Sequence, residues 1–213
     1  MATLQDVQDI VLAGKAKLTP GVVQEALDDG IDPKDILNTM IDAMAIVGER
    51  FTRNEIFVPE MLVTAKAMKK GVAVLKPYLA EGATGAMGKM VIGTVAGDLH
   101  DIGKNLVVMM VESAGFEVID LGVDVPAEVF VETVRDNPDT KLVGLSALLT
   151  TTMPAMEEIV AELNKQDFRP NIKIMVGGAP VTQEFADRIG ADCYTEDAAA
   201  AAVMAKKLVA MST

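Results

Sequence analysis

The stretch Val95-Ala-Gly-Asp98-Leu-His100-Asp-Ile-Gly103-Lys-Asn105 separates an apolar run at residues 90–95 from a helical pattern at residues 105–113. It contains the single histidine of the chain, two residues after Asp98 and three before Gly103. A polar stretch between a strand-like run and a helix-like run predicts a loop at the carboxyl end of a β-strand. In an open α/β sheet, such a loop borders the crevice where ligands bind.

His100 is a candidate metal ligand. Imidazole is the commonest metal ligand in proteins, and its second ring nitrogen is usually held by a carboxylate or a carbonyl. With Leu99 between them, Asp98 and His100 can point the same way from an extended segment, so Asp98 can supply that contact. One histidine cannot hold a bare metal ion, but it can be the single protein ligand of a metal whose equatorial positions a macrocycle fills. A plain polar loop residue is the alternative interpretation.

Two phosphate-binding motifs do not fit this stretch. A P-loop has four residues between its glycines and a Ser or Thr after the Lys. Here five residues separate Gly97 from Gly103, and Asn105 follows Lys104. The glycines at 93, 97 and 103 also do not match the dinucleotide fingerprint G-x-G-x-x-G.

After residue 88, short β-type runs alternate with helical patterns. The expected strands are 90–95, 117–121, 142–146, 173–176 and 193–194, and helices are expected to begin near residues 104, 126, 154, 182 and 196. Strict alternation of strands and helices implies right-handed crossovers and a parallel sheet covered on both faces. We therefore expect an α/β domain at residues 89–213, with a Rossmann-like (flavodoxin-like) parallel five-stranded sheet.

Residues 1–88 predict helices and no strands. Thr19-Pro20 and Asp32-Pro33 each place a capping residue before a proline, and Gly30 closes the second helix. Residues 51–58 form a break before Pro59, which opens the last helix. Helices with short connections suggest an antiparallel four-helix bundle. The glycine-rich stretch at residues 81–88 is expected to be a linker, with the domain boundary there and a possible role as a hinge or as a passive connector.

The bulk composition narrows the class of protein. The chain has 213 residues, half of them apolar, which suits one large domain or two small ones. A net charge of -12 without a cluster of Lys or Arg makes a nucleic-acid partner unlikely. A single cysteine, Cys193, excludes an internal disulfide framework and fits a reducing compartment. With no signal-peptide pattern and no apolar run of the roughly 18 residues that a membrane span needs, we expect a cytoplasmic protein.

Three separated motifs give the chain a resemblance to a known family. Each falls just after an expected strand, at the same edge of the sheet. The motifs are Asp98-x-His100-x-x-Gly103, Ser146-x-Leu148 and Gly177-Gly178. Together they resemble the D-x-H-x-x-G, S-x-L and G-G signature of cobalamin-binding modules. Over nearly its whole length the chain resembles the corrinoid proteins of methyltransferase systems and the cobalamin module of methionine synthase.

The resemblance implies roles for residues along this edge. His100 binds cobalt from below and replaces the cofactor's own benzimidazole base, whose nucleotide tail then lies in a deep slot. Asp98 and Thr152 form a relay to His100, with threonine where methionine synthase has serine. The remaining cofactor-binding residues implied by the resemblance are Leu99, Asp101, Gly103, Ser146, Leu148, Thr150, Gly177, Gly178 and Ala179.

The break in the helical part resembles the segment of methionine synthase that covers the upper face of the corrin ring. Carried over by position, the covering residues are Phe51 and Val58. The family has leucine at the second of these positions, where this chain has valine. The resemblance thus implies a helical cap over the cofactor.

The function implied is that of a methyl carrier. Cobalt(I) accepts a methyl group from a methylated donor through one methyltransferase, and a second methyltransferase receives it for a coenzyme thiol or tetrahydrofolate. With Cys193 and His100 the only residues of their types, the chain has no zinc-site cluster to activate a donor. The partners implied by the resemblance are two separate methyltransferases of barrel type and a corrinoid reductive activator. We expect no catalysis by this chain alone.

The identity of the donor stays open between methylated amines, methanol and methoxylated compounds. The stretch at residues 177–182 looks most like the methylamine group. A cobalamin-binding sensor is an alternative, although light-sensing repressors of that kind carry a DNA-binding segment and a tryptophan that this chain lacks. The small subunit of a cobalamin-dependent isomerase and a flavodoxin-like module without a corrin are further alternatives.

Overall fold

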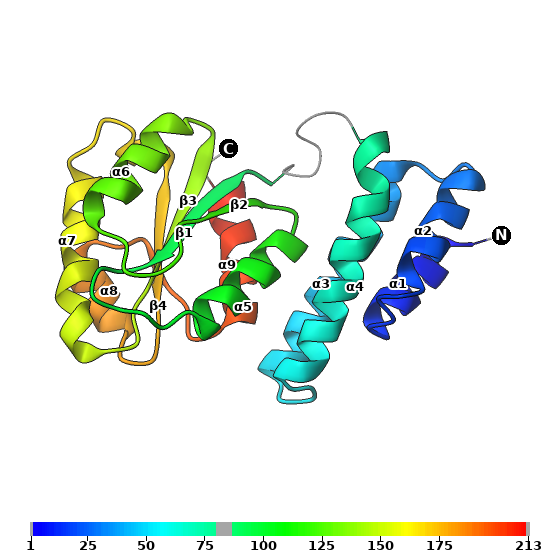
Figure 1. Ribbon diagram of the computed structural model, residues 1–213, viewed down its shortest axis with the longest axis horizontal. Coiled ribbons are helices and arrows are strands. Elements are labelled where there is room, and N and C mark those ends of the chain that lie inside the picture. Colours follow the sequence, from blue (N-terminus) through cyan, green and yellow to red (C-terminus); the bar gives the residue numbers. More distant parts are fainter. Residues whose placement is uncertain (1, 80–86, 212–213) are drawn as a thin grey trace. The chain divides into compact units, whose positions relative to one another are not determined.

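A computed structural model describes residues 2–79 and 87–211 of the chain (Figure 1). These residues separate into two compact units, a helical unit before Met87 and an α/β unit made of nearly all the residues from Met87 onward. Most of the expected linker, residues 80–86, lies outside the described residues. The domain boundary and the hinge therefore stay predictions. No helix of the described chain is long and apolar enough to cross a membrane.

The helical unit consists of the four expected helices. They are α1 (Leu4–Leu12), α2 (Thr19–Asp28), α3 (Pro33–Thr52) and α4 (Val58–Leu75), followed by a short 3-10 turn at Lys76–Tyr78. α1 packs on α3, α3 on α4, and α2 on α4. The core between them is rich in flexible thioether side chains, which fill irregular space between helices. Its buried methionines are Met40, Met44, Met61 and Met68.

Two expectations for the helical unit were wrong in detail. Thr19 is not a cap: it lies inside α2, fully buried, and its hydroxyl donates to the Lys15 carbonyl (3.1 Å). Phe51 is not in the break, because α3 continues to Thr52. That helix ends where Asn54 adopts a left-handed conformation (φ 57°), which asparagine tolerates better than most residues. The connection before α4 is therefore shorter than the sequence suggests.

The α/β unit has the expected parallel sheet. Its strands are β1 (Lys89–Thr94), β2 (Glu117–Asp120), β3 (Thr140–Ser146), β4 (Lys173–Gly177) and β5 (Cys193–Tyr194). They lie in the order β2-β1-β3-β4-β5, and every pair is parallel. The helices are α5 (Ile102–Ser113), α6 (Ala127–Asp136), α7 (Met153–Asn164), α8 (Gln183–Ile189) and α9 (Ala198–Ala210). In Figure 1, α6, α7 and α8 cover one face of the sheet, and α5 and α9 the other.

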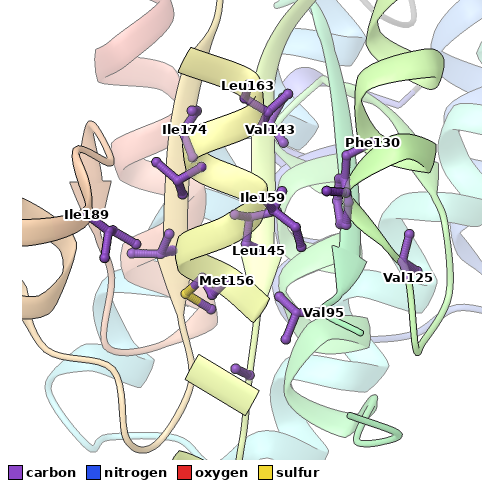
Figure 2. Close-up of a cluster of buried hydrophobic side chains, with 14 of the residues drawn as sticks. Val95, Val125, Phe130, Val143, Leu145, Met156, Ile159, Leu163, Ile174 and Ile189 are labelled. Atoms are coloured by element: carbon purple, nitrogen blue, oxygen red, sulfur yellow. The ribbon is translucent and has the colours of Figure 1, made fainter. Parts of the chain in front are cut away.

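The core under α6 and α7 holds the central strands in place (Figure 2). Phe130 of α6 and Ile159 of α7 are buried against the valines and leucines of β1 and β3. A Cβ atom on Gly93 of β1 would lie 2.8 Å from the Phe130 ring, so the helix approaches the strand more closely than a larger residue would allow. The Rossmann-like fold expected from the sequence is confirmed, and it brings β1, β3 and β4 side by side.

Candidate functional site

The three motifs meet at the carboxyl edge of the sheet. Thr94 of β1 lies opposite Ser146 of β3, and Ser146 lies opposite Gly177 of β4. The loops that follow these three adjacent strands therefore begin at the same level. This arrangement joins segments that are about 30 to 80 residues apart in the chain, as a parallel sheet does with its carboxyl ends.

The His100 side chain is hydrogen-bonded at one ring nitrogen and is otherwise half-exposed. Its ring nitrogen Nδ1 lies 2.7 Å from Asp98 Oδ1, and its backbone N–H donates to the same oxygen (3.1 Å). The Thr94 hydroxyl donates to the His100 carbonyl (2.9 Å). The side chain is 51% exposed. Because a carboxylate at Nδ1 favours a proton there, the lone pair of Nε2 is left available for a metal.

Asp98 is a fully buried carboxylate with several donors around it. Its Oδ2 accepts from the Leu148 backbone N–H (2.7 Å), the Leu149 backbone N–H (3.3 Å) and the Thr152 hydroxyl (2.8 Å). Burial alone would raise the pKa of Asp98, but the hydrogen bonds from Leu148, His100 and Thr152 outweigh it and hold the pKa well below its ordinary value. Asp98 is thus an anion at neutral pH.

Thr152 brings its hydroxyl to the position that the relay requires. The hydroxyl oxygen lies 2.8 Å from Asp98 Oδ2 and 2.9 Å from the Leu149 carbonyl oxygen. The methyl group, which serine would lack, faces Gly97: a Cβ atom added there would lie 3.7 Å from it. The structure therefore brings His100, Asp98 and Thr152 together, and the functional role of this chain of contacts stays a prediction.

The glycines of the motifs differ in what surrounds them. A Cβ atom on Gly178 would lie 1.8 Å from the Ala147 carbonyl oxygen, and the residue has φ 127°, so two loop backbones touch here. A Cβ atom on Gly177 would lie 3.1 Å from the Thr195 carbonyl oxygen. A Cβ atom on Gly103 would meet nothing within 4 Å, so that backbone is open to an approaching group. Gly177 and Gly178 therefore allow loop backbones to pack closely, and Gly103 has open space beside it.

Large aliphatic side chains lie exposed on the loops that carry His100 and Leu148. Leu99 is 71% exposed and Ile102 is 79% exposed. Leu148 and Leu149 are also exposed, on the loop that donates to Asp98. Exposed apolar groups that gather near a polar centre are typical of a ligand surface. A half-exposed imidazole among them fits a metal held in a broad, largely apolar ring, and no cluster of three or more His, Cys, Asp or Glu residues in the described chain could hold a metal by itself.

The other residues expected at this site lie on the same edge. Asp101 is exposed, and its Oδ2 accepts from the Asn105 side chain (3.1 Å). Ser146 ends β3 and is partly exposed, and Thr150 is exposed in a 3-10 turn. Ala179, directly after the glycine pair, is exposed. All four are therefore open to a ligand, and their contacts with one remain predictions.

Phe51 and Val58 belong to the helical unit. Phe51 lies in the last turn of α3, Val58 begins α4, and both are partly buried. Phe57, between them, is exposed, and its backbone N–H donates to Glu60 (2.7 Å). The proposed covering role of Phe51 and Val58 is not tested by this geometry.

Three exposed apolar residues at or near the motifs were not singled out from the sequence. They are Phe57, Ile102 and Leu149. They lie in loops or at the start of a helix, where apolar periodicity assigns neither burial nor exposure, so their exposure gives no signal in the sequence. Their proximity to the motif residues was the one available indication.

Comparisons with known proteins agree with this geometry. Residues 3–76 and residues 88–203 each match a family described as "B12 binding domain". The chain is 44% identical over 210 residues to the dimethylamine corrinoid protein of Methanosarcina barkeri, and the alignment covers 97% of each protein. These matches span both units of the chain.

Solved structures resemble the chain over the same extent. A cobalamin-binding protein from Desulfitobacterium hafniense DCB-2 has a TM-score of 0.82 and 31% identity, covering 97% of this chain and 98% of that one. A chain of the methanol:cobalamin methyltransferase complex from Methanosarcina barkeri has a TM-score of 0.82 and 30% identity, covering 97% of this chain and 79% of that one.

Proposed function

We propose that this chain, which belongs to the corrinoid proteins of methylamine methyltransferase systems, carries methyl groups between two methyltransferases. The cofactor of the family is cobalamin or a related corrinoid. The observation that carries the proposal is His100, whose imidazole is tied to a buried carboxylate at Nδ1 and faces outward beside exposed apolar side chains. When bound, the corrinoid supplies a cobalt centre that accepts and releases a methyl group.

In this proposal His100 would hold the cobalt of the bound corrinoid through Nε2. Asp98 keeps the proton on Nδ1 and fixes the plane of the ring, as the carboxylate partners of metal-bound histidines do. The Thr152 hydroxyl and the Leu148 backbone N–H hold Asp98 in turn. Leu99 and Ile102 offer the apolar surface under the ring, and the backbone at Gly103, Gly177 and Gly178 lines the slot for the nucleotide tail.

The same contacts would hold the imidazole in one orientation. Asp98 is an anion whose Oδ2 accepts from the Leu148 backbone N–H and the Thr152 hydroxyl, and its Oδ1 lies 2.7 Å from Nδ1 of His100. Asp98 and Thr152 are therefore the proposed relay to the metal ligand.

We further propose dimethylamine or another methylamine as the donor, because the relatives are named for those compounds. The proposed partners are a substrate-specific methyltransferase and a second methyltransferase, both of barrel type, together with a reductive activator. The solved relative from a methanol:cobalamin methyltransferase complex supports an assembly of this kind. We place the protein in the cytoplasm, in agreement with its free, buried Cys193 thiol.

The ligation is tested by the absorption spectrum of the protein reconstituted with methylcobalamin. We expect the wild type to bind the cofactor with its benzimidazole displaced and histidine bound, and His100→Ala to lose the histidine-bound spectrum. Asp139→Asn, a change at a residue that is 65% exposed at the amino ends of the strands, serves as the control and should keep it. Identical spectra for the wild type and His100→Ala, or no bound corrinoid in the wild type, would remove the proposal.

The donor is tested separately, by methyl transfer to the reduced holoprotein. Dimethylamine, trimethylamine, monomethylamine, methanol and a methoxylated aromatic are each supplied with the corresponding methyltransferase. Transfer from an amine alone supports the proposed class of donor. Transfer from methanol or the aromatic compound in place of the amines would contradict it and leave the ligation by His100 intact.

A further inference from the structure

We infer that Lys104 and Asp120 form a second brace for the His100 loop, independent of Asp98, and that they position the imidazole for cobalt. This inference rests on the proposed ligation by His100. The family motif does not include either residue. Both are outside the relay of Asp98 and Thr152, and they act through the backbone of the loop, so we class them as positioning residues.

Lys104 is a buried ammonium group with all of its donors used. Its side chain is 2% exposed. The Nζ atom donates to both carboxylate oxygens of Asp120 (2.7 and 2.6 Å) and to Oδ1 of Asn105 (2.8 Å). An ammonium has three N–H donors, so these contacts satisfy it fully. The three hydrogen bonds therefore fix the position and the orientation of the Lys104 ammonium group.

The pair joins two different elements. Lys104 lies in the first turn of α5, directly after the His100 loop, and Asp120 is the last residue of β2. Asp120 also accepts from the Gly122 backbone N–H (2.9 Å), which fixes the carboxylate on its own side. The start of α5 is thus anchored to the outer neighbour of β1.

The anchor reaches the residue next to His100. The Asn105 side chain contacts Lys104 through Oδ1 and donates through Nδ2 to Asp101 Oδ2 (3.1 Å). The Asn105 backbone N–H donates to the Asp101 carbonyl (2.8 Å). A continuous path of hydrogen bonds therefore runs from the end of β2 through Lys104 to Asp101, which follows His100.

The segment after β2 also holds the loop at its beginning. The Gly97 backbone N–H donates to Asp124 Oδ1 (2.7 Å), and the Asp124 backbone N–H donates to the Asp98 carbonyl (3.0 Å). Asp124 adopts φ 55° to do so, an uncommon conformation for a residue other than glycine. The His100 loop is therefore held at both ends by residues 120–124, and in its middle by Asp98 and the β3–α7 loop.

An ion pair with one buried member is poor evidence for stability by itself: the Lys104 side chain is 2% exposed and that of Asp120 is 34% exposed. Removing two charges from water is costly, and apolar side chains of similar volume often serve as well or better. What an ion pair with three directed hydrogen bonds does provide is a fixed geometry. Since axial ligation depends on the height and tilt of the imidazole, we assign the pair to the positioning of the loop.

Lys89 offers a matched control in the same sheet. It begins β1 at the opposite edge, and its Nζ lies 3.1 Å from Asp139 Oδ1 and 3.6 Å from Glu117 Oε1 of β2. It also donates to Asn137 (3.2 Å). Both lysines therefore link the β1 region to acidic groups on neighbouring segments, but Lys89 is far in sequence and at the other end of the strand from His100.

The experiment compares Lys104→Met with Lys89→Met in two forms of the protein. In the form without cofactor, hydrogen exchange is measured at the amides of residues 97–103, together with the free energy of unfolding. In the form reconstituted with methylcobalamin, the histidine-bound fraction is read from the absorption spectrum and the dissociation constant is measured. Altered partners of metal-bound histidines lower metal affinity on the order of tenfold or more, and we expect a loss of that size for Lys104→Met.

The expected result separates position from stability. Lys104→Met should lose more unfolding free energy than Lys89→Met, because it leaves the partly buried Asp120 carboxylate without its partner. Its faster exchange should nevertheless be confined to residues 97–103 and be accompanied by a smaller histidine-bound fraction of methylcobalamin. Lys89→Met should have the wild-type spectrum and affinity. If the Lys104 variant does not fold, Asp120→Asn, which keeps the shape of the side chain and an acceptor for Gly122, replaces it.

Two outcomes are distinguishable from each other. If Lys104→Met, or Asp120→Asn in its place, has the exchange, spectrum and affinity of Lys89→Met, the positioning role is wrong while ligation by His100 stands. If the wild type itself binds no cobalamin or has the spectrum of His100→Ala, the proposed function fails. In that second case faster exchange at residues 97–103 in the cofactor-free Lys104 variant still supports the brace, and unchanged exchange overturns it.

Discussion

The two edges of the parallel sheet hold their charged groups in different ways. At the amino edge, Lys89 pairs with Asp139, whose side chain is 65% exposed, so water completes the solvation. At the carboxyl edge, Asp98 is fully buried and is solvated by protein donors, and Lys104 is 2% exposed beside Asp120, which is 34% exposed. No buried side-chain nitrogen or oxygen among the described residues lacks a hydrogen-bond partner. The carboxyl edge is therefore built to hold its loops in one geometry.

The two ends of the sheet also differ in the sequence separation between residues whose side chains form buried hydrogen bonds. Buried hydroxyls away from this edge bond locally, as Thr64 does with the Glu60 carbonyl and Thr140 with the Asn137 carbonyl. The contacts of Asp98 with Leu148 and Thr152 join residues 50 and 54 positions apart. A local bond satisfies the folding of one element, whereas a long-range buried bond fixes two elements relative to each other. The bond from Lys89 to Asn137 at the amino edge also spans 48 residues, so the candidate site is distinguished by long-range bonds that converge on one fully buried carboxylate.

The largest expected effect is at the glycine where two loops touch. Gly178→Ala places a methyl group against the Ala147 carbonyl, and we expect a loss of about 4 kcal/mol in the free energy of unfolding. Gly88, just before β1 at the amino edge, has a similar positive φ (118°), but its added Cβ would meet the flexible Lys141 side chain. Gly88→Ala should therefore cost only the backbone strain, about 2 kcal/mol, in urea unfolding. If Gly178→Ala and Gly88→Ala lost the same unfolding free energy, the close backbone contact at Gly178 would not distinguish the carboxyl edge from the amino edge.

The next effect concerns the two aspartates. Asp98→Asn introduces an amide that cannot accept from Leu148, Thr152 and His100 together, so we expect about 3 kcal/mol of lost stability. Asp139→Asn changes an exposed partner of Lys89 and should change stability by less than about 0.5 kcal/mol. Urea denaturation of the cofactor-free proteins measures both values. A neutral Asp98→Asn variant would show that the buried network contributes nothing to the fold.

The stability difference between the wild type and Asp98→Asn should also depend on pH. Because the pKa of Asp98 is lower in the folded protein than in the unfolded chain, its stabilisation is fully present above the unfolded value of about 4 and is lost as the pH falls toward the folded pKa. We expect the stability difference between the wild type and Asp98→Asn to be constant from about pH 7 to about pH 5 and to narrow below about pH 4. A difference that stays constant through this acid range would contradict the direction of the pKa shift.

The smallest expected difference in stability is between variants of two buried threonines, Thr152 and Thr140. Thr152→Val removes a hydrogen bond to the charged Asp98, which we expect to cost about 2 kcal/mol. Thr140→Val, at the amino edge, removes a bond to a neutral carbonyl and should cost about 1 kcal/mol. Thr152→Ser keeps the hydroxyl and should retain the contact with Asp98. If Thr152→Val and Thr140→Val lose the same stability, the charge on Asp98 has no part in the contact.

Much of the fold could be predicted from local patterns. Apolar runs bounded by turn residues located every strand, and their alternation with helices determined the parallel topology. Two predictions were wrong. Thr19 was expected to cap a helix and lies within α2, and Phe51 was expected in the break and lies within α3. Proline after threonine suggested a cap, but burial of the Thr19 hydroxyl against the Lys15 carbonyl was favoured by packing that the sequence does not reveal.

The site was predictable in its motif residues and not in what supports them. His100 and Asp98 are two residues apart, so a local argument was sufficient to bring them together. Lys104 and Asp120 are 16 residues apart, on different elements, and only the fold shows that they meet. The exposure of Ile102 and Leu149 was also unpredictable, because they lie at the start of a helix and in a loop, where apolar periodicity assigns neither burial nor exposure.

The most direct test of the central claim uses the fact that the chain has one histidine. The protein is produced with ¹⁵N-labelled histidine, loaded with cobalamin and reduced to the cobalt(II) form, and its electron paramagnetic resonance spectrum is compared with that of unlabelled protein. Axial coordination by His100 predicts that the nitrogen splitting changes from a triplet to a doublet on labelling. A triplet that persists in the labelled protein means that cobalt keeps its own benzimidazole, and it would contradict the account.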